Sequence, residues 1–177
     1  AELYPDSALA DNARLEMSRM YLEIGDDPTL ALKEADEILK RYATSDSAPY
    51  AYLVQGEVLL THSRRKADLD KAVATFDRVS GIYPGADAVP RARYLAAEAV
   101  RLSHEPLEAL KRYRQITAVH PRDSIISKVH IGTGMALHYP SAYGLLTIGR
   151  GSNSYNSVLF FNLSKESWRP TFFQTIT

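Results

Sequence analysis

The five histidines are the first residues of this sequence that could bind a metal: His62, His104, His120, His130 and His138. No two of them have the His-x-x-x-His spacing that places two ligands on one helix face. His130 and His138 are eight residues apart, which separates them by about two helical turns. We therefore expect structural or surface histidines and no metal site.

Two glycine-containing stretches could suggest a phosphate-binding loop, "GTG" at 132–134 and "GRGSNS" at 149–154. Neither has the GxGxxG or GxxxxGK[ST] spacing between a strand and a helix that such loops need. The sequence has no cysteine, which removes thiolate nucleophiles and disulfides. No Ser-His-Asp order stands out either. We predict a non-enzymatic protein without catalytic residues or cofactors.

The charges are balanced, with 21 Lys and Arg residues against 21 Asp and Glu residues. This argues against a nucleic-acid-binding protein, because phosphate contacts need a basic excess. The strongest basic run is "SRRKAD" at 63–68, which is typical of a solvated loop; a phosphate or lipid-headgroup contact is the alternative. No apolar run approaches the roughly 20 residues that span a bilayer.

One phrase recurs along the chain and indicates how it is organised. It appears as Tyr4-Pro5, Tyr42-Ala43, Tyr83-Pro84 and His120-Pro121, at spacings of 38, 41 and 37 residues. Internal repeats of this length indicate stacked supersecondary units. The chain begins on such a phrase, so we expect it to be part of a longer array.

Two sets of small residues keep a constant distance from these phrases. Ser18, Gly56, Ala97 and Gly134 each stand 13 residues after a phrase, and Ala31, Ala72 and Ala109 each stand 12 residues before the next. All variation in length lies between the two sets, in "GDDPT", "THSRRKADLD" and "LSHEP". Insertions belong in turns, so each unit is predicted to be two helices joined there.

Apolar residues at helical spacing follow both sets of small residues, as in the series Ala72, Phe76 and Val79. Small residues let antiparallel helices approach closely, and the aromatic side chain then fills the seam. Proline ends the second helix. Pro28 and Asp70 are expected near the starts of second helices.

This pattern of Gly/Ala, Ala, Phe/Tyr and Pro resembles the tetratricopeptide repeat (TPR), a helix-turn-helix unit of ~34 residues. The matching repeats are 9–43, 46–84 and 87–121, with a partial repeat at 124–139. The usual tryptophan of the first helix is missing; Arg14, Tyr52, Arg93 and His130 stand there. The resemblance implies an all-α superhelix of about three and a half repeats over residues 1–139, with protein or peptide partners.

The linker phrases, such as "LYPDSALADNA" and "IYPGADAVPRA", resemble those of bacterial envelope TPR proteins. The outer-membrane β-barrel assembly lipoprotein and the Tol-Pal-associated cell-division coordinator are of that kind. This resemblance implies a scaffold in the periplasm or on the periplasmic face of the outer membrane, with peripheral membrane association through a lipid anchor outside this stretch. The alternatives are a cytoplasmic TPR adaptor or regulatory domain, and a non-catalytic part of an enzyme whose catalytic domain lies downstream.

In such a superhelix the first helix of each pair lines a concave groove, which is the default binding surface. The shared register places one row of side chains along it, followed by a second row and two neighbours. The residues expected there are Asn12, Tyr50, Arg91 and Lys128, then Arg19, Glu57 and Glu98, then Tyr94 and Arg101. A mixed-charge groove with tyrosines suits an extended or helical peptide.

Residues 140–177 depart from the repeat. They include Pro140, Gly144, Gly149 and Gly151, which disfavour a helix, and they hold one alanine and one acidic residue. "SVLFFNL" and "PTFFQTI" are apolar stretches that would be prone to aggregate if left uncovered. We expect an irregular or β-like tail, which is a cap, a strand that pairs with a partner, or a non-native segment.

Overall fold

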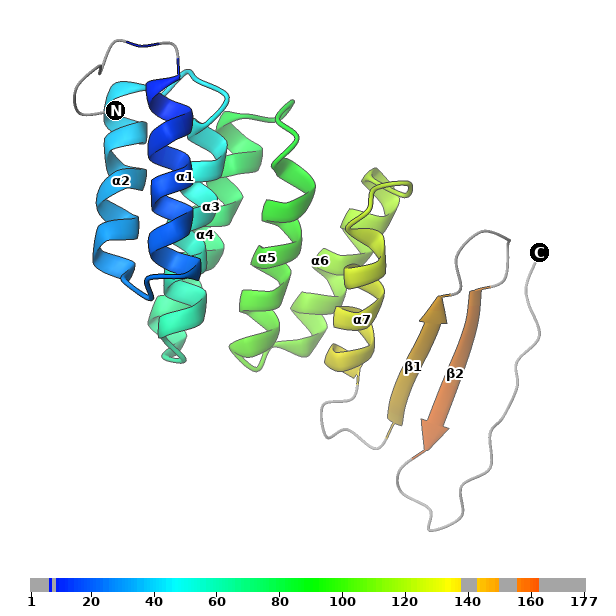
Figure 1. The fold of residues 1–177 in the computed structure, drawn as a ribbon. Coiled ribbons are helices and arrows are strands. Elements are labelled where there is room, and N and C mark those ends of the chain that lie inside the picture. Colours follow the sequence, from blue (N-terminus) through cyan, green and yellow to red (C-terminus); the bar gives the residue numbers. More distant parts are fainter. Residues whose placement is uncertain (1–6, 8, 138–142, 150–155, 163–177) are drawn as a thin grey trace. The chain divides into compact units, whose positions relative to one another are not determined.

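The computed structural model describes Ser7 and residues 9–137, 143–149 and 156–162 (Figure 1). The chain divides into two compact units, Ala1–Ser103 and His104–Thr177. The boundary falls inside the third predicted repeat, 87–121, whose two helices therefore lie in different units.

The first unit contains five helices in an antiparallel series: α1 (Ala10–Glu23), α2 (Pro28–Arg41), α3 (Ala48–His62), α4 (Lys66–Ile82) and α5 (Val89–Leu102). Each helix packs against the next one along the chain, and α3 also contacts both α1 and α5. This is a repeat-like packing of helix pairs, and the described residues of this unit form no strand. The all-α prediction is confirmed for this part of the chain.

The connections between paired helices lie where the spacing predicts them, at 24–27 and 63–65. The start of α2 combines Pro28 at its first position with Asp27 as N-cap, whose Oδ1 accepts hydrogen bonds from Thr29 N at 3.1 Å and Leu30 N at 3.0 Å. These bonds satisfy two of the free N–H groups at the helix N-terminus.

The N-terminal role expected for Asp70 is wrong. The helix α4 begins at Lys66, a full turn before Asp70. The residue before it, Arg65, has an extended backbone with φ −72° and ψ 134°. Asp68, in the first turn of α4, is the carboxylate that contacts the preceding connection. It accepts hydrogen bonds from Ser63 Oγ and Arg65 Nε, each at 2.7 Å.

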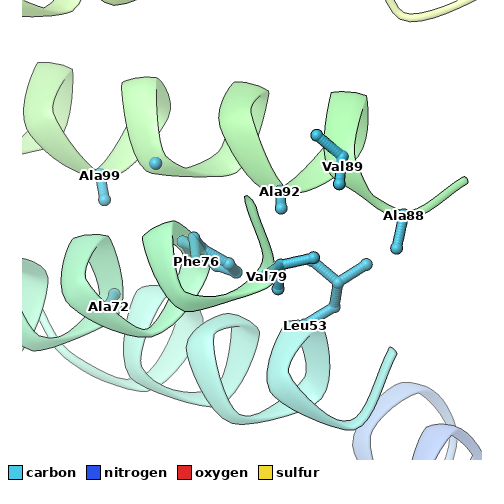
Figure 2. Close-up of a cluster of buried hydrophobic side chains, with 9 residues drawn as sticks. Leu53, Ala72, Phe76, Val79, Ala88, Val89, Ala92 and Ala99 are labelled. Atoms are coloured by element: carbon cyan, nitrogen blue, oxygen red, sulfur yellow. The ribbon is translucent and has the colours of Figure 1, made fainter. Parts of the chain in front are cut away.

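The seam between α3 and α4 is apolar. Phe76 is fully buried, and a Cβ atom added at Gly56 would lie 2.6 Å from its Cζ and 2.8 Å from its Cδ1. The aromatic ring therefore occupies the space that a side chain at position 56 would need. Figure 2 shows Phe76 and Val79 beside the alanine-rich face of α5, with Leu53 of α3 closing the cluster.

The seam between α1 and α2 is polar at equivalent positions. Ser18 Oγ donates a hydrogen bond of 2.7 Å to the carbonyl of Ala31. Arg14 and Glu34 form a buried ion pair at 2.5 Å, with 7% and 9% of their side chains exposed. Burial opposes the charge of Arg14, but its hydrogen bonds to Glu34 and Tyr42 raise its pKa above the ordinary value.

The second unit contains α6 (Pro106–Val119), α7 (Ile126–Leu137), β1 (Tyr143–Gly149) and β2 (Asn156–Asn162). The helix α6 buries Ala109, Tyr113 and Ile116, the spacing that the repeat predicts, and packs against α7. The strands β1 and β2 pair antiparallel, with Leu146 opposite Leu159. The remaining residues of 140–177 lie outside the described part, so the three accounts of the tail stay predictions. In the described part of the chain, no helix has the length and apolar character needed to span a bilayer.

Candidate functional site

Three helices of the first unit present a common face. The first helices of successive pairs, α1, α3 and α5, are linked by direct contacts of α1 with α3 and of α3 with α5. We call the side of these helices that carries Arg19, Tyr50, Glu57 and Arg91 the α1–α3–α5 face. Eight of the nine residues expected in the groove lie on these helices: Asn12, Arg19, Tyr50, Glu57, Arg91, Tyr94, Glu98 and Arg101.

The contact between α1 and α3 joins a cation to an aromatic ring. The guanidinium carbon of Arg19 lies 5.3 Å from the centroid of the Tyr50 ring, within cation–π range. Arg19 also donates a hydrogen bond of 2.9 Å to Glu16. At the N-terminal end of the same helices, Ser47 Oγ donates to Asn12 Oδ1 at 2.7 Å.

The contact between α3 and α5 is an ion pair. Arg91 Nη2 lies 2.6 Å from Glu57 Oε1, and half of the Arg91 side chain stays exposed. Further along α5, Arg101 and Glu98 pair at 2.7 Å and are largely covered, with 17% and 13% of their side chains exposed. The predicted mixed charges are therefore engaged with one another, and Arg91 is the more accessible cation of these two pairs.

Tyr94 lies on α5 one turn before Glu98. Burial raises the pKa of its hydroxyl, the negative charge of Glu98 adds to this, and Arg101 acts in the opposite direction. The phenol is therefore neutral at physiological pH. Lys128, the ninth expected residue, is exposed on α7 in the second unit.

The sequence did not predict a pocket that opens near the C-terminal ends of α1 and α3. Its volume is about 560 Å³, and its floor contains one leucine from each helix of the face: Leu22, Leu60 and Leu95. Its rim carries Glu23, Asp26 and Glu57, together with Thr61 and His62. We call this site the leucine pocket. Its residues come from α1, α3, α5 and the connection at 24–27, and each leucine looks like an ordinary core residue in sequence.

The cations of the basic run at 63–68 are engaged by groups inside and just outside the run, and Arg64 Nη1 donates a hydrogen bond to the carbonyl of Leu60. The Asp68 carboxylate lies 2.7 Å from Arg65 Nη2 and 3.8 Å from Lys71 Nζ. Lys66 Nζ lies 3.6 Å from Asp70 Oδ1. The Ser63 hydroxyl and then Arg65 lower the pKa of Asp68. This segment is organised around a carboxylate, which weakens the phosphate or lipid-headgroup alternative.

The histidines that the structure describes form no metal site. His62 Nε2 lies 3.4 Å from Asp26 Oδ1, and His62 Nδ1 lies 3.2 Å from the carbonyl of Val58. Across the described residues, no group of three or more His, Asp or Glu side chains could hold a metal ion. His138 lies outside them.

The sequence was also compared with known proteins. None of the protein-family models and none of the curated proteins in these comparisons matches the chain.

Proposed function

We propose that the chain is a non-enzymatic scaffold of the TPR type, which binds protein or peptide segments on its α1–α3–α5 face. The observation that carries the proposal is the set of contacts between successive first helices, Arg19 with Tyr50 and Glu57 with Arg91. Tyrosine and arginine are enriched among residues that dominate binding energy at protein interfaces. Repeat proteins commonly present such residues along a continuous surface.

Balanced charge on the face favours a polypeptide over a polyanion. Glu57, Glu98, Arg19 and Arg91 provide both donors and acceptors, which match the alternating polar groups of a peptide. The side chains are positioned by helices that pack on a common core, so little ordering is needed on binding.

The test begins by selecting a random-peptide display library against the whole chain. Peptides that are recovered are synthesised, and their affinities are measured by fluorescence anisotropy for the native chain and for Arg91→Glu. This change removes the ion pair and places a carboxylate beside Glu57, so we expect affinity to fall about tenfold. Arg78→Glu is the matched control, because Arg78 is exposed on α4, outside the face.

Two results would contradict the proposal. One is that no peptide is selected. The other is that Arg91→Glu and Arg78→Glu reduce affinity equally, since the binding surface would then lie elsewhere. Thermal unfolding of both variants shows that each is folded at the measuring temperature.

The proposed location is the bacterial envelope, and its support is the linker phrases around Tyr4-Pro5 and Tyr83-Pro84. In the structure Tyr83 joins successive pairs, because its hydroxyl donates a hydrogen bond of 2.7 Å to the carbonyl of Ala43. Subcellular fractionation of the native protein tests the location. Recovery with the envelope is expected, and recovery in the cytosol would favour the adaptor alternative.

A further inference from the structure

The leucine pocket combines an apolar floor with an acidic rim. Leu60 and Leu95 pack against the core cluster of α3, α4 and α5, and Leu22 packs against the cluster of α1, α2 and α3. The floor is therefore supported from beneath by close-packed side chains and is formed before any ligand arrives. A volume of about 560 Å³ is within the range of ligand-binding pockets.

The negative charge of the rim comes mainly from its side chains. The rim contains three carboxylates, Glu23, Asp26 and Glu57, and no lysine or arginine. Glu23 is the last residue of α1, whose C-terminus carries a partial negative charge, whereas at the end of α3 the Leu60 carbonyl accepts a hydrogen bond of 2.5 Å from Arg64 Nη1. Among the described residues no cation pairs with Glu23, whereas Glu57 is engaged by Arg91 and Asp26 lies 3.4 Å from His62 Nε2.

We propose that the leucine pocket binds an aliphatic side chain of a protein segment together with a lysine or arginine next to it. The aliphatic side chain would lie on the three leucines, and the cation would face Glu23 and Asp26. This inference rests on the proposed function and specifies the chemistry of the partner. The pocket is continuous with the α1–α3–α5 face through Glu57, which contacts Arg91 and also lines the pocket.

The contribution of the rim carboxylates is tested by substitutions in the protein. Glu23→Lys reverses an exposed charge, and Asp26→Asn removes a charge where φ is 46°, a conformation that asparagine tolerates. We expect the double variant to weaken the peptides selected by the native chain by about tenfold. Asp87→Lys is the matched control, since Asp87 is exposed just before α5 and lines no part of the pocket.

The contribution of the leucine floor is tested by substitutions in the peptide, because replacing a floor leucine would also disturb the core clusters. The selected peptides should share an aliphatic residue beside a lysine or arginine. Changing the aliphatic residue to serine, or the cation to glutamine, should weaken binding to the native chain. The cation-to-glutamine change should have little further effect on the Glu23→Lys/Asp26→Asn variant, since the rim charges are already altered.

The outcomes separate this inference from the proposed function. If the pocket variant binds as tightly as the native chain while Arg91→Glu binds weakly, the pocket proposal is overturned and the face stands. Selected peptides without a shared aliphatic–cation pair would also overturn it. If no peptide is selected, both proposals fail. Loss of binding in the pocket variant, with Asp87→Lys within about twofold of the native chain, supports the pocket.

Discussion

The two complete helix pairs of the first unit follow one register but fill their seams differently. The pair α3/α4 places Gly56 against the buried ring of Phe76, whereas α1/α2 has Ser18 and Ala35 at those positions. Where α3 has Tyr52, which contacts Tyr83 at a centroid distance of 6.2 Å, α1 has Arg14 paired with Glu34. A shared register fixes which positions meet, and the residues at those positions decide whether packing or polar pairing stabilises the seam.

The largest effect is expected from Phe76→Ala in the apolar seam. Phe76 is fully buried among alanines and Val79, so its loss leaves a cavity that small neighbours cannot fill. We expect the free energy of unfolding to fall by about 4 kcal/mol, as for other buried phenylalanines. Chemical denaturation of the whole chain measures this. A loss below about 1 kcal/mol would show that the ring does not support the seam.

Glu34→Ala tests the polar seam. It leaves the Arg14 guanidinium buried without its carboxylate partner, and we expect a loss of about 3 kcal/mol. The double variant Arg14→Met/Glu34→Leu replaces the pair by apolar side chains and should recover most of that loss. If the double variant is as unstable as Glu34→Ala, the ion pair itself, and not the unpaired charge, determines the stability of this seam.

The small-residue position gives a matched pair of substitutions. Gly56→Ala adds a Cβ against a ring that is closely packed, so we expect a loss of about 2 kcal/mol. Ser18→Ala removes one buried hydrogen bond without adding volume, and about 1 kcal/mol is expected. The two are compared by denaturation under the same conditions. Equal or reversed losses would contradict the distinction between the seams.

The smallest effect concerns the start of α4 and is seen as a pH dependence of thermal stability. The pKa of Asp68 is lowered by the Ser63 hydroxyl and Arg65, so its charged form stabilises the folded state. This contribution is fully present above the ordinary aspartate pKa and is lost as pH falls through the lower pKa of the folded chain. Asp68→Asn should therefore flatten the fall in thermal stability between about pH 5 and pH 2. An unchanged slope would mean that Asp68 does not contribute.

The register of small residues predicted the helix pairs and their turns, because Ala31 and Ala72 can be recognised from sequence as sites of close approach. The start of α4 was missed, because an extended Arg65 and a carboxylate at Asp68 depend on contacts made after the turn has formed. The sequence also could not show that Arg14 forms an ion pair where α3 has an aromatic contact, because the partner of Arg14, Glu34, lies 20 residues away on another helix.

The candidate site was only partly predictable for a similar reason. The register placed eight residues on α1, α3 and α5, but it could not show that Arg91 pairs with Glu57 or that Arg19 lies over Tyr50. The leucine pocket left no signal, because an apolar residue at helical spacing looks the same in a core and on a pocket floor.

The central claim is that the α1–α3–α5 face binds a protein segment, and a titration followed by nuclear magnetic resonance tests it most directly. A peptide selected from the random library is added to the isotope-labelled whole chain, and backbone amide shifts are recorded. Our account predicts changes concentrated around Arg19, Tyr50, Glu57 and Tyr94, with α2 and the outer side of α4 little affected. Changes confined to α2 and α4 would contradict it.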